Sequence, residues 1–387
     1  MRKQVKQQES VAKELLRLVE AGRLFDLQKW VADDVLLTRE ELAHHPKILL
    51  HAVKSGFHSL VEIVLKMADW SSQDLHSALS CALYERRGDL VELLINAGIA
   101  VQDVDFEHVC RTLDVSLMKR CLIAGADPTS DNAFARALDS IKARPLLRFY
   151  KDMRAEYPAL DDQAALALSQ AVSDKSVRWA CLLIWAGADP FRKVPYCLEE
   201  KWDEESCMTT AAAEACWHDD DGFIKVMKLK PTPEQAQELC LRAAYKPTVA
   251  KFEMLLKNLS AEDLNRSETG SCEFLEQLIN YRRYDFGTLY RRPEEDPQRI
   301  QCIEYLLKRG AKWNPSDEGL KRARKGLASF DGLHVASVIR LLLYIPGASQ
   351  LEKIWELCRT PKMRSKILFG DDHLWDEIQE IRHQRRR

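Results

Sequence analysis

Apolar residues recur at helical spacing before a glycine at five places in the chain. The five segments are Leu94–Ile99, Cys121–Ala126, Leu183–Ala188, Leu306–Ala311 and Leu343–Ala348. Apolar side chains stand four positions before each glycine, at the start of the segment, and again eight positions before it, so the two share one face of a helix. Glycine closes a helix in a left-handed conformation at little steric cost. The pattern therefore predicts five amphipathic helices that each end at a glycine.

The five glycines are separated by 27, 62, 123 and 37 residues. The interval of 62 is twice 31 and that of 123 is close to four times 31, which indicates a unit of roughly 31 residues with degenerate copies between the clear ones. Two copies continue as Gly-Ala-Asp-Pro, which cannot prolong a helix. We predict that each unit holds a helix, a tight turn, a second helix and an extended finger, and that the units stack.

Two helix junctions, Ala52–Val64 and Arg87–Leu94, resemble the junction of the ankyrin repeat, as do the Gly-Ala-Asp endings. The sequence departs from the family in lacking its Thr-Pro-Leu-His motif, and Val115 and Val177 align with the junction glycine Gly88. The resemblance covers roughly residues 45–348. It implies an all-α solenoid of stacked helix-turn-helix ankyrin-like repeats that acts by binding other proteins.

The resulting domain organisation has three parts. Residues 1–44 are predicted as N-terminal capping helices, 45–348 as the repeat array, and 349–387 as C-terminal capping helices with a basic tail. Closing helices are expected at 350–359 and 373–383, because a stack must cover its last apolar face. Two insertions interrupt the array, near 191–206 and 281–297.

Composition agrees with a helical protein inside the cell. The chain has 387 residues, of which 46% are hydrophobic, and only 15 are Gly and 14 Pro. No stretch is apolar enough to span a membrane, and the first residues lack the apolar core of a secretion signal. The odd count of 11 cysteines favours a reducing compartment. We expect a cytoplasmic protein.

The first insertion follows a predicted finger and mixes aromatic with charged residues, a composition suited to partner binding. It holds the candidate contacts Phe191, Tyr196 and Trp202. We add Trp217 from the unit that follows and Trp313 from the unit that holds the second insertion. The alternative is a longer finger that packs on its neighbours.

The second insertion alternates arginine with tyrosine. Its candidate partner-binding residues are Arg282, Arg283, Tyr284, Tyr290, Arg291 and Arg292. Such side chains can stack on bases and neutralise phosphates, form the hot spot of a protein interface, or pair with the nearby acidic residues at the surface.

Charge is shared unevenly along the chain. Residues 271–387 hold 22 Lys and Arg against 17 Asp and Glu, a net charge of +5, and the remainder carries 35 against 42, a net of −7. A basic run, 321–325, lies on a predicted first helix. The excess is small for a domain built for nucleic acid, so such an adaptor is the second hypothesis.

The sequence shows little catalytic chemistry. It has no Gly-rich phosphate loop, no His-Glu-x-x-His and no Gly-x-Ser-x-Gly. Cys197, Cys207, Cys216 and His218 form the only metal-like grouping, and they lack the closely spaced ligand pairs of zinc sites. We therefore expect no enzyme activity, no cofactor, no metal and no small-molecule substrate.

Three functional hypotheses remain. The first is a protein–protein interaction scaffold or adaptor that holds a partner along its concave face and finger loops. The second is a nucleic-acid-associated adaptor that uses the basic C-terminal third. The third is a cryptic hydrolase or zinc protein centred on 197–218.

Overall fold

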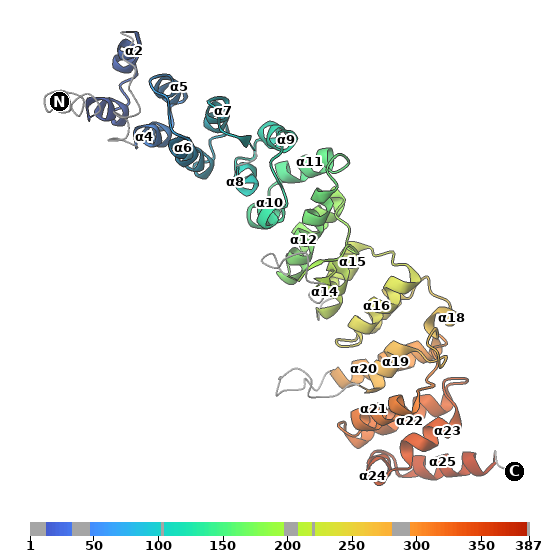
Figure 1. Cartoon of the computed structure of the whole chain (residues 1–387). Coiled ribbons are helices and arrows are strands. Elements are labelled where there is room, and N and C mark those ends of the chain that lie inside the picture. The colour runs from blue at the N-terminus through green and yellow to red at the C-terminus, as the bar shows by residue number, and fades with distance from the viewer. Residues whose placement is uncertain are drawn as a thin grey trace. The chain divides into compact units, whose positions relative to one another are not determined.

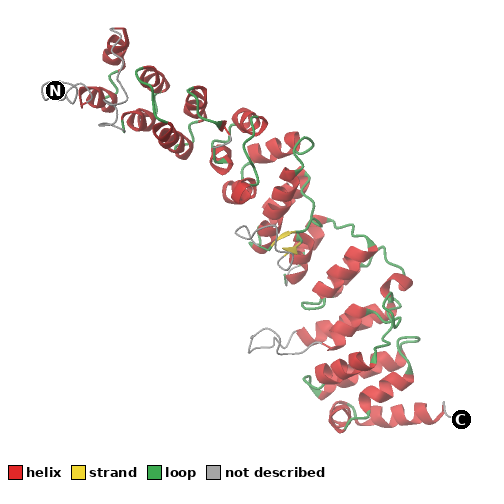
Figure 2. Cartoon of the chain, in the orientation of Figure 1, coloured by secondary structure: helices red, strands yellow, loops and turns green. Residues whose placement is uncertain are grey.

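The computed structural model describes residues 13–32, 47–101, 104–196, 208–218, 221–280 and 295–384. In this part of the chain nearly all regular structure is helical, which confirms the all-α prediction (Figures 1 and 2). The exceptions are strands β1 (Val194–Pro195) and β2 (Met208–Thr209), which form a two-stranded sheet. No helix among the described residues is both long and apolar enough to cross a membrane.

The chain divides into two compact units. The N-terminal unit is formed by most of the residues before Thr209. Its helices are α2 (Leu24–Ala32), α4 (Ile48–Ser55), α5 (His58–Lys66), α6 (Ser72–Tyr84), α7 (Gly88–Asn96), α8 (Phe106–Arg111), α9 (Val115–Ile123), the short 3-10 helix η2 (Ser130–Asn132), α10 (Ala133–Ile141), α11 (Arg144–Met153), α12 (Ala159–Ser173) and α13 (Val177–Ala186).

Helices of the N-terminal unit pack as successive pairs. Helix α4 contacts α5, α6 contacts α7, and α8 contacts α9. The first helices of neighbouring pairs also touch, since α4 packs on α6, α6 on α8 and α8 on α10. The second helices do the same where α5 meets α7 and α9 meets α11. Each pair therefore buries its apolar faces against the next pair along the chain.

Four of the five predicted glycine endings are observed, since α7, α9, α13 and α20 each end one or two residues before their glycine. Helix α22 instead ends at Tyr344, three residues before Gly347, with an extended cap at Ile345. All five glycines of the repeated pattern have positive φ, from 75° at Gly347 to 110° at Gly98, a conformation that favours glycine over residues with a side chain. Four of the five apolar residues that stand four positions earlier are completely buried: Leu94, Cys121, Leu183 and Leu306. The fifth, Leu343, is only half-buried.

Side-chain hydrogen bonds join residues about one unit apart. The Arg87 guanidinium donates to the carbonyl of Gly56, 31 residues earlier, at 2.5 Å. Arg154 donates to the carbonyl of Gly187, 33 residues later, at 2.6 Å. Buried Gln163 donates to Asn132 across 31 residues at 3.1 Å. The sequence period thus matches the distance along the chain between residues that touch.

The C-terminal unit repeats this packing. Its helices are α14 (Ala211–Trp217), α15 (Gly222–Met227), α16 (Pro233–Ala243), α17 (Val249–Leu255), α18 (Ala261–Leu264), α19 (Glu273–Asn280), α20 (Glu295–Lys308), α21 (Asp317–Leu327), α22 (Gly332–Tyr344), α23 (Leu351–Cys358), α24 (Pro361–Gly370) and α25 (Asp372–Gln384). One row of contacts runs through α14, α16, α19, α21 and α23, and a second through α15, α17, α20, α22 and α24.

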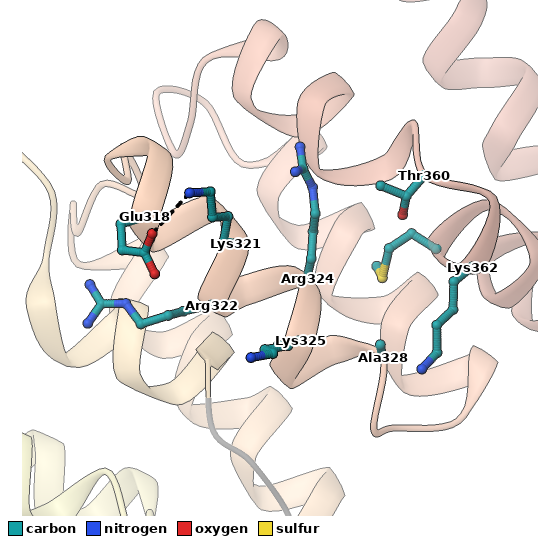
Figure 3. Close-up of a pocket in the computed structure, with 9 residues that line it drawn as sticks. Glu318, Lys321, Arg322, Arg324, Lys325, Ala328, Thr360 and Lys362 are labelled. Carbon is teal, nitrogen blue, oxygen red and sulfur yellow. Dashed lines mark hydrogen bonds and ion pairs between the residues drawn. The ribbon is translucent and has the colours of Figure 1, made fainter.

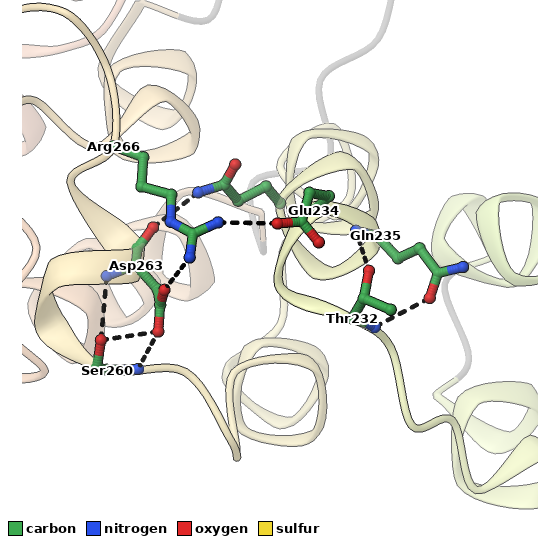
Figure 4. Close-up of polar contacts among 7 residues, drawn as sticks. Thr232, Glu234, Gln235, Ser260, Asp263 and Arg266 are labelled. Atoms are coloured by element: carbon green, nitrogen blue, oxygen red, sulfur yellow. Dashed lines mark hydrogen bonds and ion pairs between the residues drawn. The ribbon is translucent and has the colours of Figure 1, made fainter.

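Two helices of this unit were not predicted. Helix α18 is a single turn held by a capping box between Ser260 and Asp263, and Arg266 links Asp263 to Glu234 of α16 (Figure 4). Such a short helix has too few apolar positions for periodicity to reveal it.

Helix α24 lies between the two predicted closing helices. Only Met363 and Ile367 of this helix are buried, so its apolar stripe is weak. It packs on α22 where Gly370 crosses Gly332, and a Cβ atom on Gly370 would overlap the Gly332 carbonyl. The absence of side chains at this crossing lets the two helices approach.

A buried lysine ties three segments of the C-terminal unit together. Lys251 has no exposed surface, and its ammonium donates to the carbonyls of Cys216, His218 and Lys246 at 3.2, 2.7 and 2.8 Å. Three acceptors match the three protons of an ammonium group. The bonds hold the end of α14 and the α16–α17 connection against α17.

Candidate functional site

The aromatic residues predicted to bind a partner differ in exposure. Tyr196 is 61% exposed, whereas Phe191 and Trp217 are half-buried, and Trp217 stacks on Tyr245 with ring centroids 5.1 Å apart. Trp202 lies outside the described residues. Of the predicted aromatic contacts that the structure describes, Tyr196 therefore has the most accessible side chain.

The burial of Trp313 contradicts our expectation that this residue binds a partner. Its side chain has no exposed surface, and its backbone N–H donates to the Ala348 carbonyl at 2.7 Å. A side chain completely enclosed by the core cannot act as a surface anchor, so Trp313 stabilises the C-terminal unit. The six candidates of the second insertion, Arg282, Arg283, Tyr284, Tyr290, Arg291 and Arg292, all lie outside the described residues.

Of the metal-like grouping, the structure describes Cys216 and His218, whereas Cys197 and Cys207 lie outside the described residues. Burial raises the pKa of the Cys216 thiol to about 12, so the thiol is protonated at neutral pH. Burial also lowers the pKa of His218. Within the described ranges, no three His, Cys, Asp or Glu residues converge as metal ligands would.

A hollow of about 490 Å³ lies between α21 and α24 in the C-terminal unit (Figure 3). We call it the basic hollow. It is lined by Glu318, Lys321, Arg322, Arg324, Lys325, Ala328, Thr360, Lys362 and Met363. The sequence predicted the run 321–325 as a basic helical segment, and α21 is that helix. The structure adds Lys362, which α24 brings to the same hollow.

Two of these cations already have partners. The Lys321 ammonium lies 3.3 Å from a Glu318 carboxylate oxygen. The Arg324 guanidinium donates to the backbone carbonyl of Glu356, with Nε 3.1 Å away, and so ties α21 to the end of α23. Figure 3 shows Arg324 extending away from Lys325 and Lys362. Arg324 is therefore a structural residue of the wall.

A second hollow, of about 550 Å³, lies at the ends of α15 and α17. We call it the lysine-rimmed hollow. It is lined by Ile224, Lys225, Lys228, Leu229, Lys230, Pro231, Met254, Leu255, Lys257, Asn258 and Leu259. Its floor is apolar, because Ile224, Leu255 and Leu259 are buried there. Its four lysines are exposed.

Two local features of the backbone position the lysines at the rim of this hollow. Lys228 ends α15 in the left-handed conformation with φ of 47°, which turns the chain out of the helix. A capping box between Thr232 and Gln235 then starts α16 (Figure 4). The segment 228–231 connects α15 to α16, and 257–259 connects α17 to α18. The lysine-rimmed hollow thus combines two connections that each follow a helix.

Sequence reasoning missed the lysine-rimmed hollow, although a signal was present. Lys228 and Lys230 precede Lys257 by 29 and 27 residues, close to one repeat unit. Aligning the units by period would have brought these lysines to neighbouring positions.

Comparison with models of known protein families gives no match for this chain. Comparison with curated proteins gives no match either.

Proposed function

We propose that the chain is a non-catalytic interaction protein that binds a partner protein at the lysine-rimmed hollow, through an acidic, amphipathic segment of that partner. The observation that carries this proposal is an apolar floor of three buried residues surrounded by four exposed lysines. Among the described residues, none of the four lysines forms an ion pair. A segment with apolar side chains on one face and carboxylates at its edges would match both properties.

The packing within each unit supports the same proposal. Consecutive helix pairs, glycine endings and hydrogen bonds across about 31 residues are the features expected of ankyrin-like repeats. We therefore propose a divergent ankyrin-like solenoid, in which the ends of the second helices α15 and α17 and the segments that follow them form the binding surface. Because helices and capped turns hold this surface in place before binding, less conformational entropy is lost on association.

The chemistry of the described cysteines supports a role without catalysis. All nine are free, and seven of them are buried: Cys110, Cys121, Cys216, Cys240, Cys272, Cys302 and Cys358. Burial raises the pKa of Cys121 to about 11 and that of Cys302 to about 12, so these thiols are poor nucleophiles at neutral pH. Free thiols also suit the cytoplasm, which is the location we propose.

The experiment compares two variants with equal changes in charge. Lys228→Glu with Lys257→Glu reverses two charges of the lysine-rimmed hollow. Lys66→Glu with Lys308→Glu reverses two exposed lysines that lie in intrahelical ion pairs elsewhere. Partners captured by the natural protein are purified, and their affinities for all three proteins are measured by calorimetry.

The hollow variant should bind its partner at least about tenfold more weakly, while the control variant should bind within about threefold of the natural protein. Met254→Asp tests the apolar contacts independently, because Met254 is a half-buried apolar residue that also lines the hollow, and it should weaken the same complex. Equal affinities for the natural protein and the hollow variant would refute the proposal.

A further inference from the structure

The basic hollow carries positive charge that the protein does not neutralise. Arg322, Lys325 and Lys362 line it and are exposed. No carboxylate among the described residues forms an ion pair with any of the three. Glu318 lies 3.3 Å from the Lys321 ammonium, and Arg324 is bound to the end of α23. The hollow therefore has three cationic groups available to a ligand.

The cationic side chains on α21 lie close enough to repel one another when no ligand is bound. Lys325 follows Arg322 by three residues and Lys321 by four, and like charges at these spacings repel on a helix. Helix α24 adds Lys362 from the opposite wall. An anion in the hollow would relieve this repulsion and gain several charge-assisted hydrogen bonds at once.

We infer that the basic hollow binds the phosphoryl group of a phosphoserine or phosphothreonine in a partner protein. The inference rests on the proposed function, because the ligand belongs to a protein. A phosphoryl group presents nearly two negative charges and three acceptor oxygens. The Arg322 guanidinium can donate two parallel hydrogen bonds to it, and Lys325 and Lys362 supply ammonium groups. The Thr360 hydroxyl, which makes no capping bond at the start of α24, adds a neutral donor.

The surroundings favour this compact anion over a nucleic acid. Asp317 and Glu318 begin α21, and Glu352 and Glu356 lie on the adjacent α23. A nucleic acid spreads charge along its whole length and needs a continuous basic surface. These carboxylates interrupt such a surface, whereas a single phosphoryl group fits within the hollow.

The experiment measures binding of labelled ligands to the full chain by fluorescence anisotropy. The probe is a ten-residue peptide with one phosphoserine among neutral polar residues, compared with its unphosphorylated twin and with a single-stranded oligonucleotide. The test variant is Arg322→Gln with Lys325→Gln. The matched control, Lys66→Gln with Lys308→Gln, removes two exposed lysine charges that line neither hollow. Thermal melts verify that both variants are folded, and Lys362→Gln on α24 is a second, independent variant.

We expect the phosphopeptide to bind at least about tenfold more tightly than its twin. The test variant and Lys362→Gln should each lose much of this preference, and the control should keep it. Equal binding of both peptides, or a preference that survives in the test variant, would overturn the inference. Tight binding of the oligonucleotide with no binding of the phosphopeptide would overturn it in favour of nucleic acid.

Failure of this inference is distinguishable from failure of the proposed function. The proposed function fails if Lys228→Glu with Lys257→Glu leaves partner affinity unchanged, whichever peptide binds. The inference fails if the variants of the basic hollow leave the phosphopeptide preference unchanged, whatever the effect of the lysine-rimmed hollow on partner binding.

Discussion

Replacing Leu94 by alanine should destabilise the N-terminal unit far more than the same change at its neighbour Leu93. Both residues belong to α7, but Leu94 has no exposed surface and Leu93 is half-buried. The substitution removes three carbon atoms, which at about 0.8 kcal/mol each contribute roughly 2.4 kcal/mol of transfer free energy. The cavity left at a rigidly packed site adds to this, so we expect a loss of about 3–4 kcal/mol for Leu94→Ala.

Leu93→Ala is the matched control, because it changes the same amino acid in the same helix. Its expected cost is about 1–1.5 kcal/mol, since part of the Leu93 side chain is already in water. Urea unfolding followed by circular dichroism gives the free energies, and hydrogen exchange locates the damage. Since α7 packs on α5 and α6, protection should fall first in these three helices. Equal costs for the two variants, or uniform loss of protection from end to end, would refute this account of the packing.

Three further predictions concern polar groups that are buried or half-buried. Lys251→Met removes three hydrogen bonds to carbonyls and should lower the free energy of unfolding, measured by urea titration, by about 2–4 kcal/mol. Lys257 is exposed, so Lys257→Met is the control and should leave that free energy nearly unchanged. Because burial raises the pKa of the Cys110 and Cys240 thiols, mass spectrometry should detect their alkylation at pH 7.5 only after unfolding; rapid labelling in the native state would contradict this. Burial lowers the folded-state pKa of His218, so the unfolded chain binds the proton more readily, and stability should decline as pH falls below about 6.5. In urea titrations across pH 7 to 5, His218→Asn should reduce that decline, and an unchanged slope would show that His218 is not its source.

Local patterns in the sequence were enough to predict most of the helices, but not α18 and α24. Apolar spacing, together with the glycines at 98, 125, 187 and 310, specified where four of the second helices end, because capping depends on a few adjacent residues. The period of roughly 31 residues also anticipated the separation at which residues touch, as in the bond from Arg87 to Gly56. Helix ends depend on residues that are close in the chain, and the length of a repeat can be read from the spacing of its copies in the sequence.

Only the tertiary structure decided which surface groups come together. The repeat pattern treated Leu94 and Leu343 as equivalent, yet Leu343 is half-buried, and Trp313 was expected at the surface but lies in the core. The basic hollow forms because α24 brings Lys362 close to α21. The weak apolar stripe of α24 is the reason that the sequence did not predict this helix. Burial and surface charge depend on contacts between residues tens of positions apart. Such contacts are set by the packing of whole helices, which local periodicity does not encode.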